Sequence, residues 1–519
     1  MSDIDYVIAA LYNKGVRLWR NGDQLTYTAP RGVLMTEDIS RLKERKLEII
    51  QFLIASSSAA DSPLAVMPRS PSEPIPLTFV QQTIWKEFST VGMQFNRRTL
   101  ANAIRIFGTL DLAVMRAAFS SVVQQHEILR ARIVPRTETA THELVCESAC
   151  ALDVVDLMNR GSNPEERLRG TVEDFVNQSC DMTVGPLFAA RVVRVGNCDN
   201  VLVVTLDHII ADATSLGIVF RELLTNYLSA IRDLRRPLSR EAIQFADYAI
   251  REKKSDPLWT EMHGVFWQKK LCGASRSRIA ANDGVTDRKR LRFLQISFAL
   301  GKELSDGLRN IARRERTTLV MVVLAAYFAS VSRWCKSWDI TIGFVSDGRH
   351  RQELQNAVGI FTYVLYLRVY LLDTDTFASL LQGVIREYQT SYKHQDFGRM
   401  ALAWQSVEYT KNTTFNWNPR GRPVGADEGD SAVGSNIRDA GITLRPFRFS
   451  RPAADVEWND RIAKIEWEPT VTFSELADGI AGVLCYREDR STASTMENFI
   501  LNFRQMANQL AEFPDGRLI

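Results

Sequence analysis

Helix-like and strand-like runs alternate along this chain, and their two periods predict a mixture of helices and strands. Apolar positions at helical spacing predict helices over 112–130, 213–232, 258–272, 302–314, 318–332 and 494–513. Short apolar or alternating runs predict strands over 187–195, 201–206, 293–298, 339–344 and 365–369. We therefore expect an α/β (α+β) fold with two mixed lobes, which we place at 77–250 and 251–519.

The first 55 residues form a separate predicted unit of helices and a β-hairpin. Two short alternating runs, 16–19 and 24–28, flank Asn21-Gly22-Asp23, which is a strong signal for a hairpin turn. Thr36 is the expected N-cap of the helical part that follows. The apolar face of that part is expected to include Ile39, Leu42, Leu47, Ile50 and Leu53.

Two stretches lack any apolar period. Residues 56–76 are rich in Ser, Pro and Ala, a composition that cannot form a core, so they are predicted to be a linker. Residues 420–441 are rich in Gly and Asp and are predicted to form a loop.

The composition excludes several classes of protein. Charged residues make up 24% of the chain, the net charge is +3 and like charges do not gather in blocks, so a nucleic-acid partner is not expected. The seven cysteines are scattered, with only Cys146 and Cys150 close together, which favours a reduced, cytoplasmic protein and no metal site. The longest apolar run, Thr317 to Val331, is shorter than the roughly 18–20 residues of a membrane span. We expect no membrane association.

Residues 207–215 carry the most informative chemistry of the chain. The apolar strand predicted over 201–206 delivers His208 and Asp212 onto a loop, four residues apart. A histidine can accept or donate protons near neutral pH, and a carboxylate beside it can hold the loop through an ion pair. A buried structural histidine at a strand end is the other interpretation.

The segment 207–213 resembles the His-His-x-x-x-Asp-Gly motif of nonribosomal peptide synthetase condensation domains, with Asp207 for the first His and Ala213 for the Gly. Seven further segments resemble other motifs of that family, in the family's order: 76–85, 125–132, 245–249, 343–349, 358–368, 394–396 and 415–417. Within them, Thr83 stands where the family has Arg, and Tyr363 stands where it has Asn. The resemblance runs from residue 76 to the C-terminus.

Residues 1–55 resemble the TubC-like N-terminal docking domain of such synthetases, through 15–19, 22–23, 25–32 and 46–49. In that family the hairpin pairs with a short, often acidic C-terminal tail of the upstream synthetase subunit. An exposed strand edge suits this role because it binds an extended peptide by main-chain hydrogen bonds. The residues expected to face the partner are Arg17, Trp19, Arg20, Tyr27 and Arg31. The alternative is a small cap that packs on its own domain.

The last residues, 513–519, resemble the linker from a condensation domain to an adenylation domain. The resemblance therefore implies an N-terminal piece of a larger synthetase, with a downstream adenylation domain as a partner.

The resemblance implies two chloramphenicol-acetyltransferase-like lobes in a V-shaped pseudo-dimer, with His208 in a tunnel between them. It also implies a reaction, in which the amine of an aminoacyl thioester on one carrier protein attacks an acyl or peptidyl thioester on another. Both substrates would be carried on the 4'-phosphopantetheine arms of donor and acceptor carrier proteins, with no cofactor bound covalently to this chain. A free α-amine has a pKa of about 7.7–8.0, so alignment of the two groups can supply much of the acceleration.

The resemblance also assigns roles to side chains. His208 is expected to act in catalysis, as a base, as a hydrogen-bond partner of the amine or as a donor to the oxyanion. Asp212 is expected to hold the loop through an ion pair with Arg349. Ser215 and Tyr363 are candidates for contacts with the tunnel or with pantetheine, although a Ser at a helix start is usually a cap.

Two departures from the family motif bear on activity. A carboxylate of Asp207 that faced His208 would favour the imidazolium and weaken a base. The methyl of Ala213 stands where a Gly permits close approach of the backbone. His126 and His394 are expected to be structural.

Three other functions stay open. The first is a catalytically degenerate condensation-like domain that serves as a binding platform for carrier proteins. The second is an ester-forming domain with a hydroxyl nucleophile, which would depend more strongly on a base because an alcohol is hardly ionised at neutral pH. The third is a coenzyme A-dependent acyltransferase of the same fold.

Overall fold

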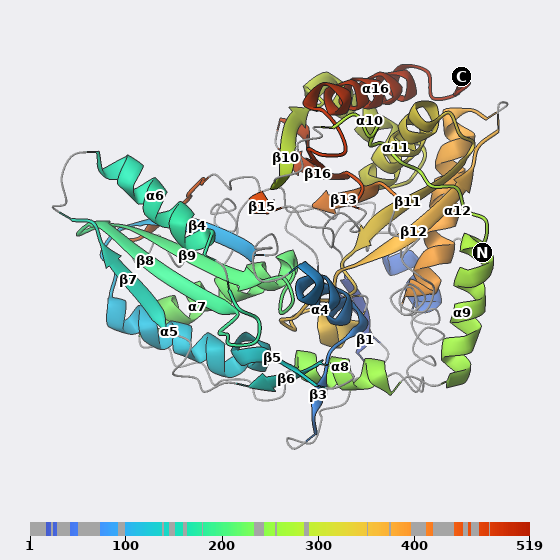
Figure 1. The fold of residues 1–519 in the computed structure, drawn as a ribbon. Coiled ribbons are helices and arrows are strands. Elements are labelled where there is room, and N and C mark those ends of the chain that lie inside the picture. Colours follow the sequence, from blue (N-terminus) through green and yellow to red (C-terminus); the bar gives the residue numbers. More distant parts are fainter. Residues whose placement is uncertain are drawn as a thin grey trace.

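The computed structural model contains two lobes, each built on its own β-sheet (Figure 1). The residues that the structure describes are 17–21, 24–28, 42–49, 73–91, 99–136, 140–144, 151–158, 163–178, 180–232, 243–254, 257–284, 290–349, 351–372, 375–395, 412–418, 441–449, 455–457, 467–476 and 478–518.

The first lobe holds a five-stranded sheet in the order β14-β4-β9-β8-β7. Its strands are β4 (Thr99–Phe107), β7 (Leu152–Asp156), β8 (Phe188–Gly196), β9 (Asp199–Asp207) and β14 (Thr443–Pro446). The β7–β8 pair is parallel, and the other three pairs are antiparallel. Its helices are α5 (Leu112–Gln125), α6 (Pro164–Val176) and α7 (Ala213–Ile231).

Strand β9 is buried on both faces, which explains its unbroken apolar run. Leu202 and Val204 belong to the core that contains α5 and α7, whereas Val201 and Val203 pack with α6 on the other side of the sheet. Figure 1 shows α6 above the sheet and α5 below it. A strand covered on both faces has no solvated side, so polar residues do not alternate with apolar ones.

A smaller three-stranded sheet completes the first lobe, in the order β3-β6-β5. It comprises β3 (Ile75–Pro76), β5 (Ala131–Pro135) and β6 (Ala140–Leu144). The helices α4 (Phe79–Val91) and α8 (Phe245–Lys253) contribute to the same core, through Ile84 and Phe245 among others.

The second lobe is built on a seven-stranded sheet in the order β12-β11-β13-β16-β17-β10-β15. Its strands are β10 (Arg290–Ala299), β11 (Asp339–Ser346), β12 (Tyr363–Tyr370), β13 (Thr414–Asn418), β15 (Asp455–Glu457), β16 (Thr470–Leu476) and β17 (Gly479–Arg487). Its helices are α9 (Pro257–Leu271), α10 (Lys302–Arg314), α11 (Leu319–Cys335), α12 (Phe377–Lys393) and α16 (Ala493–Glu512).

Helix α11 is the central helix of the second core. Every residue from Met321 to Ser332 is buried, and the Thr318 side chain caps the helix by accepting a hydrogen bond from the Met321 amide. A helix that is apolar all round is stable only when other elements surround it. Two lobes, each a sheet covered by helices, confirm the expected fold class of two chloramphenicol-acetyltransferase-like lobes.

Two segments from the second half of the sequence pack in the first lobe. Val358 and Phe361 belong to its core, and β14 extends its sheet by pairing with β4, with Leu444 opposite Ile106. The boundary that we place at residue 250 stays a prediction. Both of these segments follow residue 250 in the sequence but pack in the first lobe.

The N-terminal unit contains the expected hairpin. Strands β1 (Arg17–Asn21) and β2 (Gln24–Thr28) are antiparallel, with Asn21 opposite Gln24. Helical residues follow at 42–44 and 46–49. Leu42 and Ile49 are buried there, whereas Leu47 is 75% exposed, so the prediction that Leu47 belongs to a buried apolar face is wrong. Thr36, Ile39, Ile50 and Leu53 lie outside the described residues. So do residues 56–72 of the linker predicted at 56–76 and residues 420–440 of the loop predicted at 420–441.

The ends of the elements follow local chemistry. The prediction for α10 has the observed bounds, whereas the helix predicted over 112–130 is in fact α5 followed by a 3-10 turn, Glu127–Arg130. The break falls at His126, whose backbone is extended with φ −116° and ψ 98°.

Among the described residues, no single helix is long and apolar enough to cross a membrane, and α10 with α11 passes that test only as a pair bent by 111°. The described cysteines, Cys180, Cys198, Cys272, Cys335 and Cys485, are free thiols. The close pair Cys146 and Cys150 lies outside the described residues.

The contact between Gly359 and Phe245 gives a test of how the segment 358–361 packs against the first lobe. A methyl group on Gly359 would lie 2.0 Å from Cδ2 of Phe245. Gly359→Ala is therefore expected to lower the free energy of unfolding by about 1–3 kcal/mol. Gly383 in α12 has no neighbour within 4 Å of such a methyl, and Gly383→Ala is expected to raise it by about 0.5–1 kcal/mol. Chemical denaturation of both variants is the measurement, and equal changes would contradict the packing.

Candidate active site

A tight turn joins β9 to α7 and carries His208. The Asp207 amide donates to the Leu187 carbonyl over 2.9 Å, and the Ile210 amide donates to the Asp207 carbonyl over 3.1 Å. Ile209 and Ile210 are fully buried, so the turn is anchored in the first core. Helix α7 begins directly after the turn.

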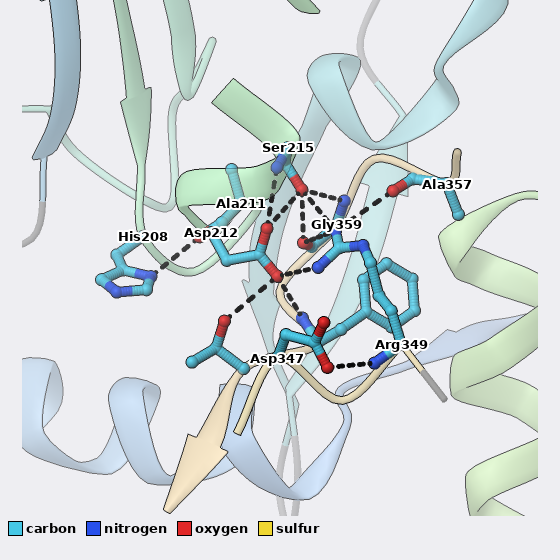
Figure 2. Close-up of polar contacts among 10 residues, drawn as sticks. His208, Ala211, Asp212, Ser215, Asp347, Arg349, Ala357 and Gly359 are labelled. Atoms are coloured by element: carbon cyan, nitrogen blue, oxygen red, sulfur yellow. Dashed lines mark hydrogen bonds and ion pairs between the residues drawn. The ribbon is translucent and has the colours of Figure 1, made fainter. Parts of the chain in front are cut away.

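The ring of His208 is held in one tautomer. Its Nδ1 lies 2.8 Å from the carbonyl oxygen of Ala211 (Figure 2). Because a carbonyl oxygen only accepts, Nδ1 carries the proton, and Nε2 of the neutral ring carries the lone pair. Figure 2 shows the ring set apart from the polar cluster around Asp212. His208 is partly exposed, so the structure places its imidazole ring at the edge of a turn that is anchored in the first core.

Asp207 supports the same turn. Its side chain is 7% exposed, and Oδ1 accepts a hydrogen bond from the Ile209 amide over 2.9 Å. This contact is a local turn closure of the kind that Asp side chains commonly make. Ala213 is the first residue of α7 and is exposed.

Asp212 is the centre of a buried polar network that joins the two lobes (Figure 2). Its Oδ2 accepts hydrogen bonds from Arg349 Nη1 at 2.5 Å and from the Phe361 amide at 3.0 Å. Its Oδ1 caps α7 by accepting from the Ser215 amide at 2.8 Å. Burial alone would raise the pKa of Asp212, but the charge of Arg349 and these hydrogen bonds outweigh it and hold the pKa below its ordinary value. Asp212 is therefore an ionised carboxylate.

Arg349 and Ser215 complete this network. Arg349, which follows β11, is 2% exposed, and its guanidinium lies 4.4 Å from the centre of the Phe361 ring. Its Nη2 donates to Ser215 Oγ over 2.9 Å. Ser215 Oγ also lies 2.7 Å from the Gly359 carbonyl oxygen and accepts from the Gly359 amide at 3.0 Å. Ser215 is fully buried, and this placement favours a structural role over the predicted contact with pantetheine.

Other predicted residues make their side-chain contacts outside this network. The hydroxyl of Tyr363 donates to Gln395 Oε1 over 2.6 Å, and the Tyr363 side chain is buried. His126 Nε2 lies 2.5 Å from Glu222 Oε2, within the first lobe. His394 stacks on Phe266 with ring centres 3.7 Å apart. These packing contacts favour the structural roles expected for the two histidines.

The predicted docking residues are described only in part. Tyr27 is 42% exposed on β2, as a partner-facing residue requires. Arg31 and the side chains of Arg17, Trp19 and Arg20 lie outside the described part of the chain, so their roles stay predictions. Within the described part, no group of three or more His, Cys, Asp or Glu residues could hold a metal ion.

Gln81 and His142 are two residues of the site region that the sequence reasoning missed. Gln81 is fully buried on α4, and its Nε2 donates to the Ile209 carbonyl in the turn over 2.8 Å. The same Nε2 lies 2.8 Å from Nε2 of His142, which is on β6. Burial lowers the pKa of His142 to about 3, so its ring is neutral. The sequence signal that could have identified Gln81 is its position inside the segment 76–85, which resembles a family motif.

The comparison with protein families decides the assignment. Residues 72–518 match the condensation domain family, and residues 4–54 match the TubC N-terminal docking domain family. The chain belongs to the condensation domain family. The predicted order of docking domain and condensation domain is thereby confirmed.

Curated relatives of this condensation domain are much longer proteins. One subunit of the linear gramicidin synthase of Brevibacillus parabrevis is 28% identical over 463 residues, which cover 86% of this chain and 8% of the relative. Surfactin synthase subunit 1 of Bacillus subtilis is 23% identical over 468 residues, which cover 87% of this chain and 12% of the relative.

Solved structures show the same fold. The X-domain from teicoplanin biosynthesis matches with a TM-score of 0.71 and 22% identity, over 88% of this chain and 98% of that one. The first condensation domain of the calcium-dependent antibiotic synthetase matches with a TM-score of 0.66 and 16% identity, over 86% and 98%.

The Asp212–Arg349 pair gives a stability test of this condensation domain. Asp212→Asn leaves the charge of Arg349 buried without its partner. Arg349→Met leaves the charge of the Asp212 carboxylate buried without its partner. Each change is expected to lower the free energy of unfolding by about 3–5 kcal/mol. The double variant should lose clearly less than the two single losses combined, because no lone charge remains buried. Chemical denaturation of the four proteins is the measurement, and additive small losses would mean that the pair contributes little.

The neutral His142 predicts how stability depends on pH. Its folded pKa of about 3 lies below the ordinary value of 6.5, so the unfolded chain binds the proton more readily. Stability is therefore fully present above about pH 6.5 and falls by up to about 1.4 kcal/mol per unit as the pH drops towards 3. His142→Gln keeps an acceptor but removes the titration, so the slope should become shallower. The measurement is the free energy of unfolding of the wild type and of His142→Gln at several pH values. Equal slopes against pH for the two proteins would contradict the prediction.

Proposed function

We propose that this chain is the condensation domain of a nonribosomal peptide synthetase, which joins a donor acyl or peptidyl thioester to the amine of an acceptor aminoacyl thioester. The amine nitrogen attacks the thioester carbonyl, the C–N bond forms and the C–S bond breaks. The amine loses a proton, and the donor pantetheine leaves as a thiol. Family membership over residues 72–518 supports the class of reaction.

The observation that carries the proposal is the fixed tautomer of His208. With Nδ1–H bound to the Ala211 carbonyl, Nε2 can accept a proton from the attacking amine or a hydrogen bond from it. Asp212, ionised and buried against Arg349, holds the start of α7 and so holds the turn. His208 is the proposed catalytic residue, and Asp212 and Arg349 are its support.

The proposal includes partners. The substrates arrive on the 4'-phosphopantetheine arms of donor and acceptor carrier proteins, in a tunnel between the lobes. The N-terminal docking domain binds the C-terminal tail of an upstream synthetase subunit in the cytoplasm, and an adenylation domain follows in the full synthetase. The match of residues 4–54 to the docking family and the exposed Tyr27 on the hairpin support this assignment.

A binding platform without catalysis is the second candidate, and the altered motif favours it. Asp207 and Ala213 stand where the family has His and Gly. Against this candidate, the Asp207 carboxylate closes the turn through the Ile209 amide, and Ala213 is exposed at the start of α7. Both placements support a turn that keeps its shape, and the position of His208, with Asp and Ala at these two positions.

Intact-protein mass spectrometry of a reconstituted reaction tests the proposal. The upstream carrier, with the C-terminal tail of its subunit, is loaded with an acyl thioester, and the downstream carrier is loaded with an amino acid. The wild type is expected to transfer the acyl mass to the acceptor, and His208→Ala to be slower by about 10²–10⁴-fold. His208→Gln separates two roles, because Gln can hydrogen-bond the amine but cannot serve as a base near neutral pH.

Two control reactions interpret a negative result. If the wild type binds both carriers but transfers nothing, and Asp207→His with Ala213→Gly transfers acyl groups, the chain is a platform. If transfer occurs only when the acceptor bears a hydroxyl, the domain forms esters. Turnover of free acyl-coenzyme A without carriers would replace the proposal by a coenzyme A-dependent acyltransferase.

A further inference from the structure

The amide of Gln81 is oriented without ambiguity. Its Oε1 lies 3.0 Å from the backbone nitrogen of Thr78, which can only donate. Its Nε2 lies 2.8 Å from the carbonyl oxygen of Ile209, which can only accept. The two contacts fix the oxygen and nitrogen of the amide, so Nε2 is the atom that faces His142.

This orientation fixes the protons of His142 as well. The two nitrogens are 2.8 Å apart, and an amide nitrogen only donates, so Nε2 of His142 accepts and its proton lies on Nδ1. A protonated His142 would present an N–H group to the Gln81 N–H and break the contact. His142 is 6% exposed and packs near Phe245, with ring centres 6.2 Å apart. The hydrogen bond therefore requires a neutral ring, and burial away from water keeps the ring neutral.

The bonded carbonyl belongs to the peptide that follows His208 and Ile209. Two other polar groups of this turn, the amides of Ile209 and Ile210, donate to Oδ1 and to the main-chain oxygen of Asp207. The carbonyl of Ala211, two residues further along the chain, accepts a hydrogen bond from Nδ1 of His208. Rotation of the peptide between residues 209 and 210 would therefore move the group that orients the His208 ring.

The pair is polar in a place where the fold needs only packing. Gln81 shares α4 with the core residue Ile84, and His142 stands opposite the core residue Ile133 in the three-stranded sheet. Among the described residues, Nδ1 of His142 has no hydrogen-bond partner. A buried polar pair adds little net stability over an apolar one, but it selects a single arrangement of the groups that it binds.

We propose that Gln81, seated on His142, is a positioning residue that fixes the peptide between Ile209 and Ile210 and, through the Ala211 carbonyl, the ring of His208. This inference rests on the proposed function, in which His208 acts on the amine. In this role Gln81 acts through the turn, by its hydrogen bond to the Ile209 carbonyl.

Gln81→Met is the principal variant, because Met has a similar volume and no donor. In the reconstituted transfer reaction it should lower kcat on the order of 10- to 100-fold, with KM for either carrier unchanged. In a His208→Ala background the same change should lower kcat no further, because the residue being positioned is absent. Gln82→Met is the matched control: Gln82 is the next residue of α4, is exposed and donates to the Leu77 carbonyl over 2.9 Å. Its kcat should equal that of the wild type.

A second pair of variants covers the case in which Gln81→Met does not fold. His142→Leu removes the acceptor of Gln81 and should lower kcat. His142→Gln, which can place Oε1 near the position of the ring Nε2, should restore most of the loss. Equal kcat values for these two variants would show that the acceptor has no part in positioning.

NMR of labelled histidine rings gives a readout that does not depend on turnover. The chain has six histidines, and the His208 signal is assigned by its absence in His208→Ala. The wild type should show His208 with its proton on Nδ1, and Gln81→Met should show a mixture of tautomers. An unchanged His208 signal, or an equal fall of kcat in both backgrounds, would overturn the inference. If the wild type makes no product, the proposed function fails, and the NMR result alone decides the role of Gln81.

Discussion

The buried ion pair between Asp212 and Arg349 is the contact on which the site depends. It joins the N-cap of α7 in one lobe to the segment that follows β11 in the other, and both side chains are nearly inaccessible to water. Two charges in a dry interface are stable only together, so the pair also fixes how the lobes meet. The Asp212 carboxylate also accepts hydrogen bonds from the amides of Ser215 and Phe361. Its two oxygens therefore hold together the start of α7, the segment around Phe361 and, through α7, the turn of His208.

His208 combines a rigid attachment with an accessible ring. The turn beneath it is held by three kinds of hydrogen bond: main chain to main chain, from an amide to the Asp207 carboxylate, and from the Gln81 side chain to a carbonyl. Ile209 and Ile210 are buried, whereas His208 is partly exposed. Such an arrangement suits catalysis by alignment, because little freedom is left to lose when a substrate arrives.

Local patterns in the sequence predicted those parts of the fold that local chemistry determines. The bounds of α10 follow from its apolar spacing, and the hairpin follows from Asn21-Gly22-Asp23. The Asp212–Arg349 pair was expected only through the family resemblance, because 137 positions separate its members. The contact between Gln81 and His142 spans 61 positions and has no motif of its own. Leu47 was misplaced because an apolar residue at helical spacing need not face the core.

Strand β14 has a consequence for how the molecule is made. It covers one edge of the first sheet by pairing with β4, yet it follows β4 by more than 300 residues of chain. During synthesis the first lobe therefore emerges with the edge of β4 uncovered, and it waits until residues 443–446 have left the ribosome. An open strand edge is a template for pairing between chains, so completion of the first lobe and protection from aggregation both come late. Strands β15, β16 and β17 of the second lobe are made later still.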